Sequence, residues 1–436
     1  MLRVKWLCSF IFIASNLSVF SGNSIAVSES KYDKHRKIQL QKYNNYKTDY
    51  LKKYERYKLV ILKKWGVAEL SSKSEFFSYN TDNNIKILAD FKNDIIEVSI
   101  LNSDGLTDKD IEKSVQTAIL QSLNVSPQQA LKNENETLNK QPKTLSLTNK
   151  VDIDSKSLLA YMGLNNSQDL SDIVTKKEEV LQKNQQKIVY ERTNKRLEDQ
   201  ILNLDNYSSF AKEGANKEQT QKLKESLEQD IKQLNDEKAE VTQKNIRTYK
   251  IKLDRKRYQK AESYLEEVKN NALKWNVPKE IILAIMETES NFNPMARSHI
   301  PAYGLMQIVP STAGADVNNK IFNIKGKPTP NHLYDSTKNI AYGSAYFNIL
   351  MSRYLNTVKN PLSRLYCAIA SYNTGIGNVS KAFNHGSKNR LKAINIINTL
   401  TPNEVYNVLK SRTHTETQRY LDKVIRSKKY FYDATT

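Results

Sequence analysis

The chain has 436 residues, a length at which two or three folded units are expected. Its 67 basic and 47 acidic residues give a net charge of +20, which favours a polyanionic partner: nucleic acid, an anionic membrane surface or an acidic polymer. The hydrophobic share of 39% is low, so part of the chain is expected to lie outside any packed core.

The N-terminus has the pattern of an export signal. Arg3 and Lys5 precede an apolar run over residues 6–20, and the small-residue stretch Ser24-Ile25-Ala26 follows. The run is short for a membrane span, so we expect a signal peptide over residues 1–26, with an uncleaved membrane anchor as the alternative. Export disfavours nucleic acid as the partner and favours an envelope polymer.

The two cysteines and five histidines indicate neither a disulfide nor a metal site. Cys8 lies within the predicted signal, which leaves Cys367 alone in the exported chain. Cys367 has apolar neighbours and is expected to be a core residue rather than a nucleophile. The histidines have no metal-ligand spacing, so we expect no metal and no cofactor.

A small α+β module is predicted over residues 45–165. Period-two patterning between residues 75 and 101, punctuated by Asn- and Asp-rich turns, predicts an antiparallel meander. Thr107 is placed to cap a following helix over about 109–123, whose apolar face would cover the sheet. The predicted strands are Phe76–Tyr79, Ile85–Leu88 and Ile95–Ile100.

A polar stretch over 132–150 is predicted to be a linker, and a charge-dense helical segment follows over 176–241. Two apolar stripes favour a coiled-coil hairpin, with a pair of solvated, weakly contacting helices as the alternative. This insertion would act as a spacer or bind an envelope protein. The stripes consist of Leu181, Ile188, Leu197, Ile201 and Leu204, and of Leu223, Leu227, Ile231 and Leu234.

The last part of the chain, from residue 256, has helical patterns and no convincing strand. It holds 25 basic and 12 acidic residues, and the stretch 351–400 holds seven basic residues and no acidic ones. Such a surface would attract a glycan that bears carboxylates. The alternative is an ordinary solvated basic face.

A candidate catalytic acid lies in this region. Pro278 favours a helix start, and the apolar run that follows it predicts a helix buried in the middle of its domain. Pro294 places Glu289 near the last turn, where the helix dipole and apolar neighbours would raise its carboxyl pKa. Glu287 would face nearly the opposite way. A neutral carboxylic acid suits glycosidic cleavage, whereas two surface acids in ion pairs are the alternative.

Three further segments could complete a site. Gly304 would let backbone approach a ligand closely, and Gln307 could hold a sugar hydroxyl or acetamido group. Tyr372 and Asn373 precede a glycine-rich turn and could orient the acid and the sugar. Tyr420 lies on the predicted final helix.

Taken in order, these segments resemble the four motifs of lytic transglycosylases with a lysozyme-like catalytic domain. The resemblance extends to the membrane-bound members of that family through residues 312–317, 393–402 and 419–424, and more weakly through the module at 75–125. The four motifs are Glu289–Pro294, Gly304–Gln307, Ala370–Gly375 and Arg419-Tyr420.

The resemblance implies a mainly α fold with an all-α lysozyme-like domain over 256–430. It further implies a peptidoglycan lytic exotransglycosylase without cofactor, which cleaves between N-acetylmuramic acid and N-acetylglucosamine. Glu289 would be the sole catalytic acid and then base. Ser290 and Gln307 would line the cleft, with Gly304 beside the substrate. The backbone of Met306 would position glycan and acid together with Tyr372, Asn373 and Tyr420.

Two readings compete with this one. In a hydrolytic muramidase, water would attack and Asp316 or Asp335 would assist. In a non-enzymatic wall-binding protein, the helical insertion would be the working part. We expect the protein in the periplasm, associated with the outer membrane, although Asn23 follows Phe20-Ser21-Gly22 where a lipid-anchored relative would need cysteine.

Overall fold

The structure is a computed structural model of the whole chain, which divides into two units, Met1–Asp49 and Tyr50–Thr436. The predicted signal peptide, residues 139–150 of the predicted linker and much of the helical insertion lie outside the described residues. The linker prediction is wrong for residues 132–138, which are helical. Those described are 61, 64–67, 69–80, 82–101, 105–138, 156–180, 187–198, 201, 221, 224–229, 231–232, 246–298 and 302–435. Across these ranges, no helix is both long and apolar enough to span a membrane.

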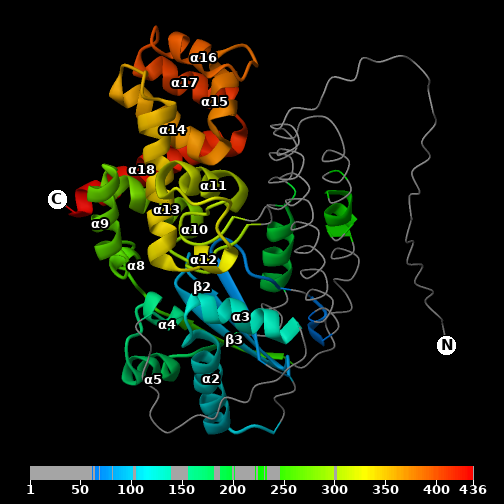
Figure 1. The fold of residues 1–436 in the computed structure, drawn as a ribbon. Helices are drawn as coiled ribbons and strands as arrows, with labels where there is room; N and C mark the ends of the chain where they lie inside the picture. The colour runs from blue at the N-terminus through cyan, green and yellow to red at the C-terminus, as the bar shows by residue number, and fades with distance from the viewer. Residues whose placement is uncertain are drawn as a thin grey trace. The chain divides into compact units, whose positions relative to one another are not determined.

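The fold is mainly helical with one antiparallel sheet, as the sequence predicts (Figure 1). The sheet has the order β1-β2-β3-β5-β4. Its strands are β1 (Glu75–Tyr79), β2 (Ile85–Asp90), β3 (Ile95–Leu101), β4 (Glu178–Val180) and β5 (Ile246–Lys252). The helices of the N-terminal part are α2 (Asp108–Leu123), α3 (Pro127–Leu138), α4 (Leu158–Tyr161) and α5 (Ser167–Thr175).

The described residues of the C-terminal part from residue 256 form helices joined by loops, with two isolated β-bridges and no strand. Its α-helices are α8 (Gln259–Glu262), α9 (Leu265–Trp275), α10 (Lys279–Ser290), α11 (Ala315–Val317), α12 (Pro330–Leu333), α13 (Ser336–Ile349), α14 (Pro361–Thr374), α15 (Ile376–Phe383), α16 (Arg390–Ile397), α17 (Pro402–Arg412) and α18 (Thr415–Thr435). Three π-helical turns, η3 (Pro310–Gly314), η4 (Asn318–Phe322) and η5 (Leu350–Tyr354), lie among them.

The three predicted strands are confirmed, and so is the helix that follows them. Alternate residues of β2 and β3 face the main core, where α2 packs on them through Ile111, Val115 and Ile119. The predicted cap is Thr107, whose hydroxyl accepts the N–H of Asp110 while the Asp110 carboxylate accepts the N–H of Thr107.

The sequence analysis missed β4 and β5. The strand β5 pairs along its whole length with β3, and β4 pairs with β5. The start of the predicted insertion, where a helix was expected, is therefore a strand, and β4 and β5 belong to the same sheet as residues 75–101. In β5 the buried Tyr249 and Ile251 alternate with Lys250 and Lys252, a period-two pattern that the sequence analysis overlooked.

The two predicted stripes of the insertion contact each other where they are described. Leu197 and Leu227 form a buried cluster, against which Ile201 and Ile231 pack. These four residues belong to the stripes expected for a coiled-coil hairpin, one pair from each.

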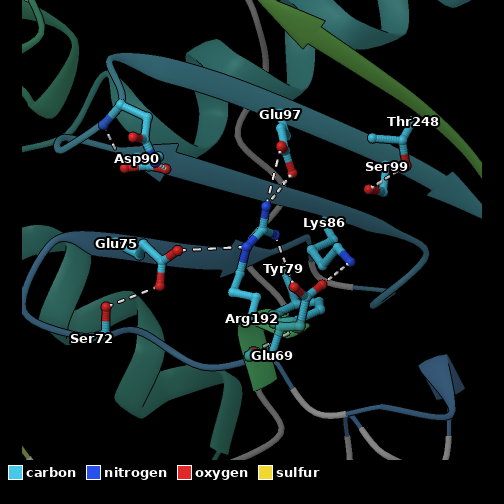
Figure 2. A network of polar contacts seen from close by, with 11 residues as sticks. Glu69, Ser72, Glu75, Tyr79, Lys86, Asp90, Glu97, Ser99, Arg192 and Thr248 are labelled. Carbon is cyan, nitrogen blue, oxygen red and sulfur yellow. Dashed lines mark hydrogen bonds and ion pairs between the residues drawn. The ribbon is translucent and has the colours of Figure 1, made fainter. Parts of the chain in front are cut away.

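The second face of the sheet carries a network of ion pairs (Figure 2). Arg192, from the helical segment 187–198, lies 2.9 Å from Glu69, 3.1 Å from Glu97 and 3.5 Å from Glu75. Glu69 also pairs with Lys86. Burial alone would raise the pKa of Glu69, but the charges of Lys86 and Arg192 outweigh it and lower that pKa. This network fastens the helical segment to the sheet.

Candidate active site

The candidate acid is presented by α10, the most completely buried helix of the C-terminal part. Residues 281–286 have no exposed surface, which confirms the prediction of a central helix. The helix follows Pro278 and ends at Ser290, so Glu289 lies in its last turn as expected. Asn291 and Phe292 then take positive φ angles of 51° and 64°. Asn291 is the left-handed cap that ends the helix, and Phe292 is the less usual of the two because bulky residues rarely take a positive φ.

Glu289 is buried and surrounded by groups that act on its charge. Its side chain is only 7% exposed, and burial raises its carboxyl pKa above the usual value. The ammonium of Lys73 and the nearby hydroxyl of Tyr420 oppose this rise, whereas the charge of Glu416 adds to it slightly. The net rise favours the protonated carboxyl that a general acid needs.

Glu287 is directed elsewhere, as its spacing from Glu289 predicts. Its carboxylate accepts two hydrogen bonds of 2.5 Å from Arg257 and another of 2.5 Å from the hydroxyl of Ser427. The ion-pair alternative therefore holds for Glu287, whereas Glu289 is buried beside the other candidate residues.

The segment Tyr303–Gln307 lies against the end of α10. Gly304 has φ +74°, and a Cβ there would lie 2.4 Å from Asn339 Nδ2 and 2.5 Å from the Leu333 carbonyl. Asn339 holds this segment by accepting the Met306 N–H at 2.8 Å and donating to the Tyr303 and Leu333 carbonyls at 2.7 Å. The glycine thus permits a close approach, but to the protein's own buried asparagine.

Ser290 does not line a cleft, contrary to the expectation. It has no exposed surface, and its hydroxyl lies 2.8 Å from both the Met286 and the Leu305 carbonyls. A serine hydroxyl in the last turn of a buried helix readily donates to backbone carbonyls. Its contact is structural: it joins the end of α10 to the segment that contains Met306.

Gln307 is also nearly buried and has a positive φ of 49°. Its amide Nε2 donates to the carbonyls of Ala296 at 3.0 Å and Gly304 at 3.1 Å. Its Oε1 is buried without a hydrogen-bond partner among the described residues. The side chain therefore braces the loop with its amide nitrogen and retains an acceptor.

Tyr372 and Asn373 lie in the last turn of α14 and contact two different elements. The Tyr372 hydroxyl donates to the Met306 carbonyl at 2.9 Å, which ties the Gly304–Gln307 segment to α14. Asn373 Oδ1 accepts a 2.8 Å hydrogen bond from Thr417 of α18. Burial raises the pKa of Tyr372 well above its usual value, and the charge of Glu289 adds to the rise, so the phenol stays protonated.

Tyr420 comes from α18, which packs extensively along α10. The pKa of its phenol is raised by burial and then by the charge of Glu289, which places the two groups side by side. The hydroxyl makes no hydrogen bond of ordinary geometry with the described residues. It is therefore a buried donor beside the acid, available to a ligand or to Glu289 after a small movement.

Three residues of the site escaped the sequence analysis: Lys73, Asn339 and Thr417. Each reaches the site only through the tertiary fold, since Lys73 is 216 residues away from Glu289 along the chain. A buried asparagine with two donor and one acceptor contacts has no signature in the sequence.

The other chemistries considered find little support. The described residues contain no group of acidic, histidine or cysteine side chains that could hold a metal ion. Asp335 caps α13, and Asp316 contacts the side chains of Lys320 and Tyr354. Neither carboxylate contacts Glu289 in the described part of the chain. Cys367 is fully buried, and burial raises the pKa of its thiol. Its position agrees with the expectation of a core residue.

Comparison with known proteins identifies the class of the C-terminal part. Residues 266–395 match the family model described as "Transglycosylase SLT domain". This confirms the resemblance to lytic transglycosylases predicted from the motifs.

Curated relatives make the likeness more specific. The chain is 44% identical over 176 residues to proteins named membrane-bound lytic murein transglycosylase C from Yersinia pestis (strain Pestoides F) and Yersinia pseudotuberculosis serotype O:1b (strain IP 31758). The match covers 39% of this chain and 47% of each relative, so the chain spans about half the length of the relatives it matches. A solved lytic transglycosylase from Pseudomonas aeruginosa, an inactive mutant, is 23% identical with a TM-score of 0.28, covering 39% of this chain and 24% of that one.

Proposed function

We propose that the protein is a peptidoglycan lytic transglycosylase, with Glu289 as its only catalytic carboxyl group. One observation carries the proposal: a carboxyl group with a raised pKa, buried beside the Tyr420 and Tyr372 phenols, within a transglycosylase SLT domain. The expected substrate is the β-1,4 bond between N-acetylmuramic acid and N-acetylglucosamine.

In this mechanism Glu289 first donates its proton to the glycosidic oxygen that leaves C1 of N-acetylmuramic acid. The C6 hydroxyl of the same sugar then attacks C1 and gives its proton to the ionised Glu289. The product is a 1,6-anhydromuramoyl end, no water is consumed, and the acid is regenerated. General acid catalysis of this kind contributes ~10²–10⁴-fold, and the intramolecular attack gains from proximity.

The carboxylates suggested for a hydrolytic mechanism are engaged elsewhere. Asp335 accepts the backbone N–H of Lys338, and Asp316 lies at Lys320. Glu416 of α18 is the other carboxylate whose charge reaches Glu289, and its effect is the smallest of those that act there. A second catalytic carboxylate would need to lie about 5–9.5 Å from the first. Glu416 is therefore the residue to test.

Location and partners follow from the relatives and from charge. We propose that the protein acts in the cell envelope, in the periplasm at the outer membrane, because the relatives are named membrane-bound and murein is their named substrate. The basic stretch 351–400 would attract anionic glycan strands. A protein partner bound through the insertion at 176–241 remains a prediction, as do the domain boundaries 45–165, 176–241 and 256–430.

The test is digestion of purified sacculi, with products identified by mass spectrometry. Wild type should release anhydromuramoyl ends, which are lighter by one water than hydrolysis products. Glu289→Gln should release none and stay folded, whereas Glu280→Gln, at the other end of the same helix, should be active. Near wild-type activity of Glu289→Gln would refute the proposal. If wild type releases hydrolysis products and Glu416→Gln loses activity, the muramidase is favoured. If wild type is inactive but binds sacculi, the binding protein is favoured.

A further inference from the structure

A cation from the N-terminal part of the chain lies against the candidate acid. Lys73 Nζ is 3.3 Å from Glu289 Oε2. Two backbone contacts accompany it: Asn293 Nδ2 donates to the Lys73 carbonyl at 3.2 Å, and the Arg297 N–H donates to the Ser72 carbonyl at 3.5 Å. The segment before β1 is thus held on the residues that follow α10.

The same segment is held from its other side by the sheet. The Ser72 hydroxyl donates to Glu75 Oε2 at 3.1 Å, and the Ser72 N–H donates to the Glu75 carbonyl at 2.9 Å (Figure 2). Glu75 in turn lies 3.5 Å from Arg192. Lys73 therefore projects from a braced turn, which fixes the point from which its side chain reaches Glu289.

The place of this cation matters because the acid has two opposite tasks. Burial favours the neutral carboxyl that is present before the first step, and the ammonium favours the carboxylate that is present between the two steps. The other groups that face Glu289 are Glu416 and Tyr420 from α18 and Tyr372 from α14. Among these described residues, Lys73 alone brings a positive charge.

We propose that Lys73 is a positioning residue for the catalytic acid: its ammonium orients the Glu289 carboxyl and stabilises the carboxylate that is left once the proton has passed to the glycosidic oxygen. The proposal rests on the proposed function and extends it to the N-terminal part of the chain. Lys73 keeps 37% of its side chain exposed, so the ammonium remains in contact with solvent while Glu289 is nearly enclosed.

The first test compares Lys73→Met, Lys73→Arg and the control Lys109→Met, which removes a charge from an exposed position on α2. The dependence of kcat/KM on pH is measured with sacculi as substrate. In Lys73→Met the fall of kcat/KM on the alkaline side of the pH profile should move to higher pH, because without the cation Glu289 stays protonated to higher pH. Its maximal kcat/KM should fall about tenfold, the cost of one charged hydrogen bond. Lys73→Arg should keep this fall near its wild-type pH, and Lys109→Met should match wild type.

Two results would overturn the proposal. One is an unchanged pH profile in Lys73→Met, and the other is an equal, pH-independent loss in the Met and Arg variants, which would show a purely structural role. Lys73→Gln replaces the Met variant if the latter does not fold.

A second measurement separates this proposal from the proposed function. The Glu289 carboxyl is titrated by ¹³C NMR in the full chain, its signal identified by its loss in Glu289→Gln. Lys73→Met should raise the titration midpoint even if wild type releases no anhydro product, in which case only the proposed function fails. An unmoved midpoint would refute the role of Lys73 whatever the activity.

Discussion

Replacing Gly304 by alanine tests whether the close approach in the Tyr303–Gln307 segment is needed for the site. An added Cβ would lie 2.4 Å from Asn339 Nδ2 and 2.5 Å from the Leu333 carbonyl, both closer than real Cβ contacts allow. The Leu333 carbonyl belongs to the backbone at the end of α12, so it cannot move cheaply. The segment itself must shift, and Met306 with it.

The magnitude can be worked from two contributions. The positive φ of +74° costs alanine about 1–2 kcal/mol relative to glycine. Overpacking adds about 1–3 kcal/mol, and displacement of a buried asparagine that makes three hydrogen bonds adds about 1 kcal/mol more. We expect Gly304→Ala to lose about 4 kcal/mol of unfolding free energy.

Gly386 provides the matched control, because it has φ +82° but nothing within 4 Å of its Cβ position. Gly386→Ala should therefore show the backbone cost alone, about 1 kcal/mol. Urea unfolding followed by circular dichroism gives both values, and sacculus digestion at a temperature where both variants are folded gives activity. Gly304→Ala should also lose activity and Gly386→Ala should not. A difference in stability below 1 kcal/mol between the two variants would show that the contacts around Asn339 do not constrain this segment.

Three further predictions concern charge and hydrogen bonding. Arg192→Met should lower the unfolding free energy in urea by about 3 kcal/mol, because it leaves three carboxylates around its place; a loss under 1 kcal/mol would contradict the network's role. Tyr372→Phe should cost about 1 kcal/mol of stability and lower kcat roughly tenfold, since the Met306 carbonyl loses its 2.9 Å partner; unchanged kinetics would count against it. The raised pKa of Glu289 means that the folded state holds its proton to higher pH than the unfolded chain does, so ionisation costs stability as pH rises from about 4.3 through the folded pKa. The stability of Glu289→Gln relative to wild type, from urea unfolding at several pH values, should thus grow with pH over this window and then stay constant; a flat difference would argue against the raised pKa.

Local patterns in the sequence were enough for much of the fold. Period-two alternation located β1, β2 and β3, and the apolar run from Ile281 located α10. Proline and glycine marked the ends of two helices of the candidate site: Pro278 precedes α10 and Gly375 follows α14. These signals act over a few residues, which is why a single sequence carries them.

The missing parts depend on contacts between distant segments. Strand β5 pairs with β3, which is about 150 residues away along the chain, and its short alternation of Tyr249 and Ile251 with lysines does not reveal that partner. The resemblance implied that Ser290 lines the cleft, but the direction of its side chain depends on the Leu305 carbonyl, fifteen residues later. Lys73 could not be found from any motif, because its role comes from its position next to Glu289 in the folded chain.

The site is completed by segments outside the stretch that the family model matches. Glu289, Met306 and Tyr372 fall within residues 266–395, whereas Tyr420 comes from α18 and Lys73 from the turn before β1. The matched stretch therefore contains the acid and its supporting loop but only part of what sets the acid's charge. Burial, the phenol of Tyr420 and the ammonium of Lys73 act on the same carboxyl group with opposite signs. Because two of these three influences arise from outside the matched stretch, substitutions there can change the pKa of Glu289 without any change in the segments that surround it in the sequence.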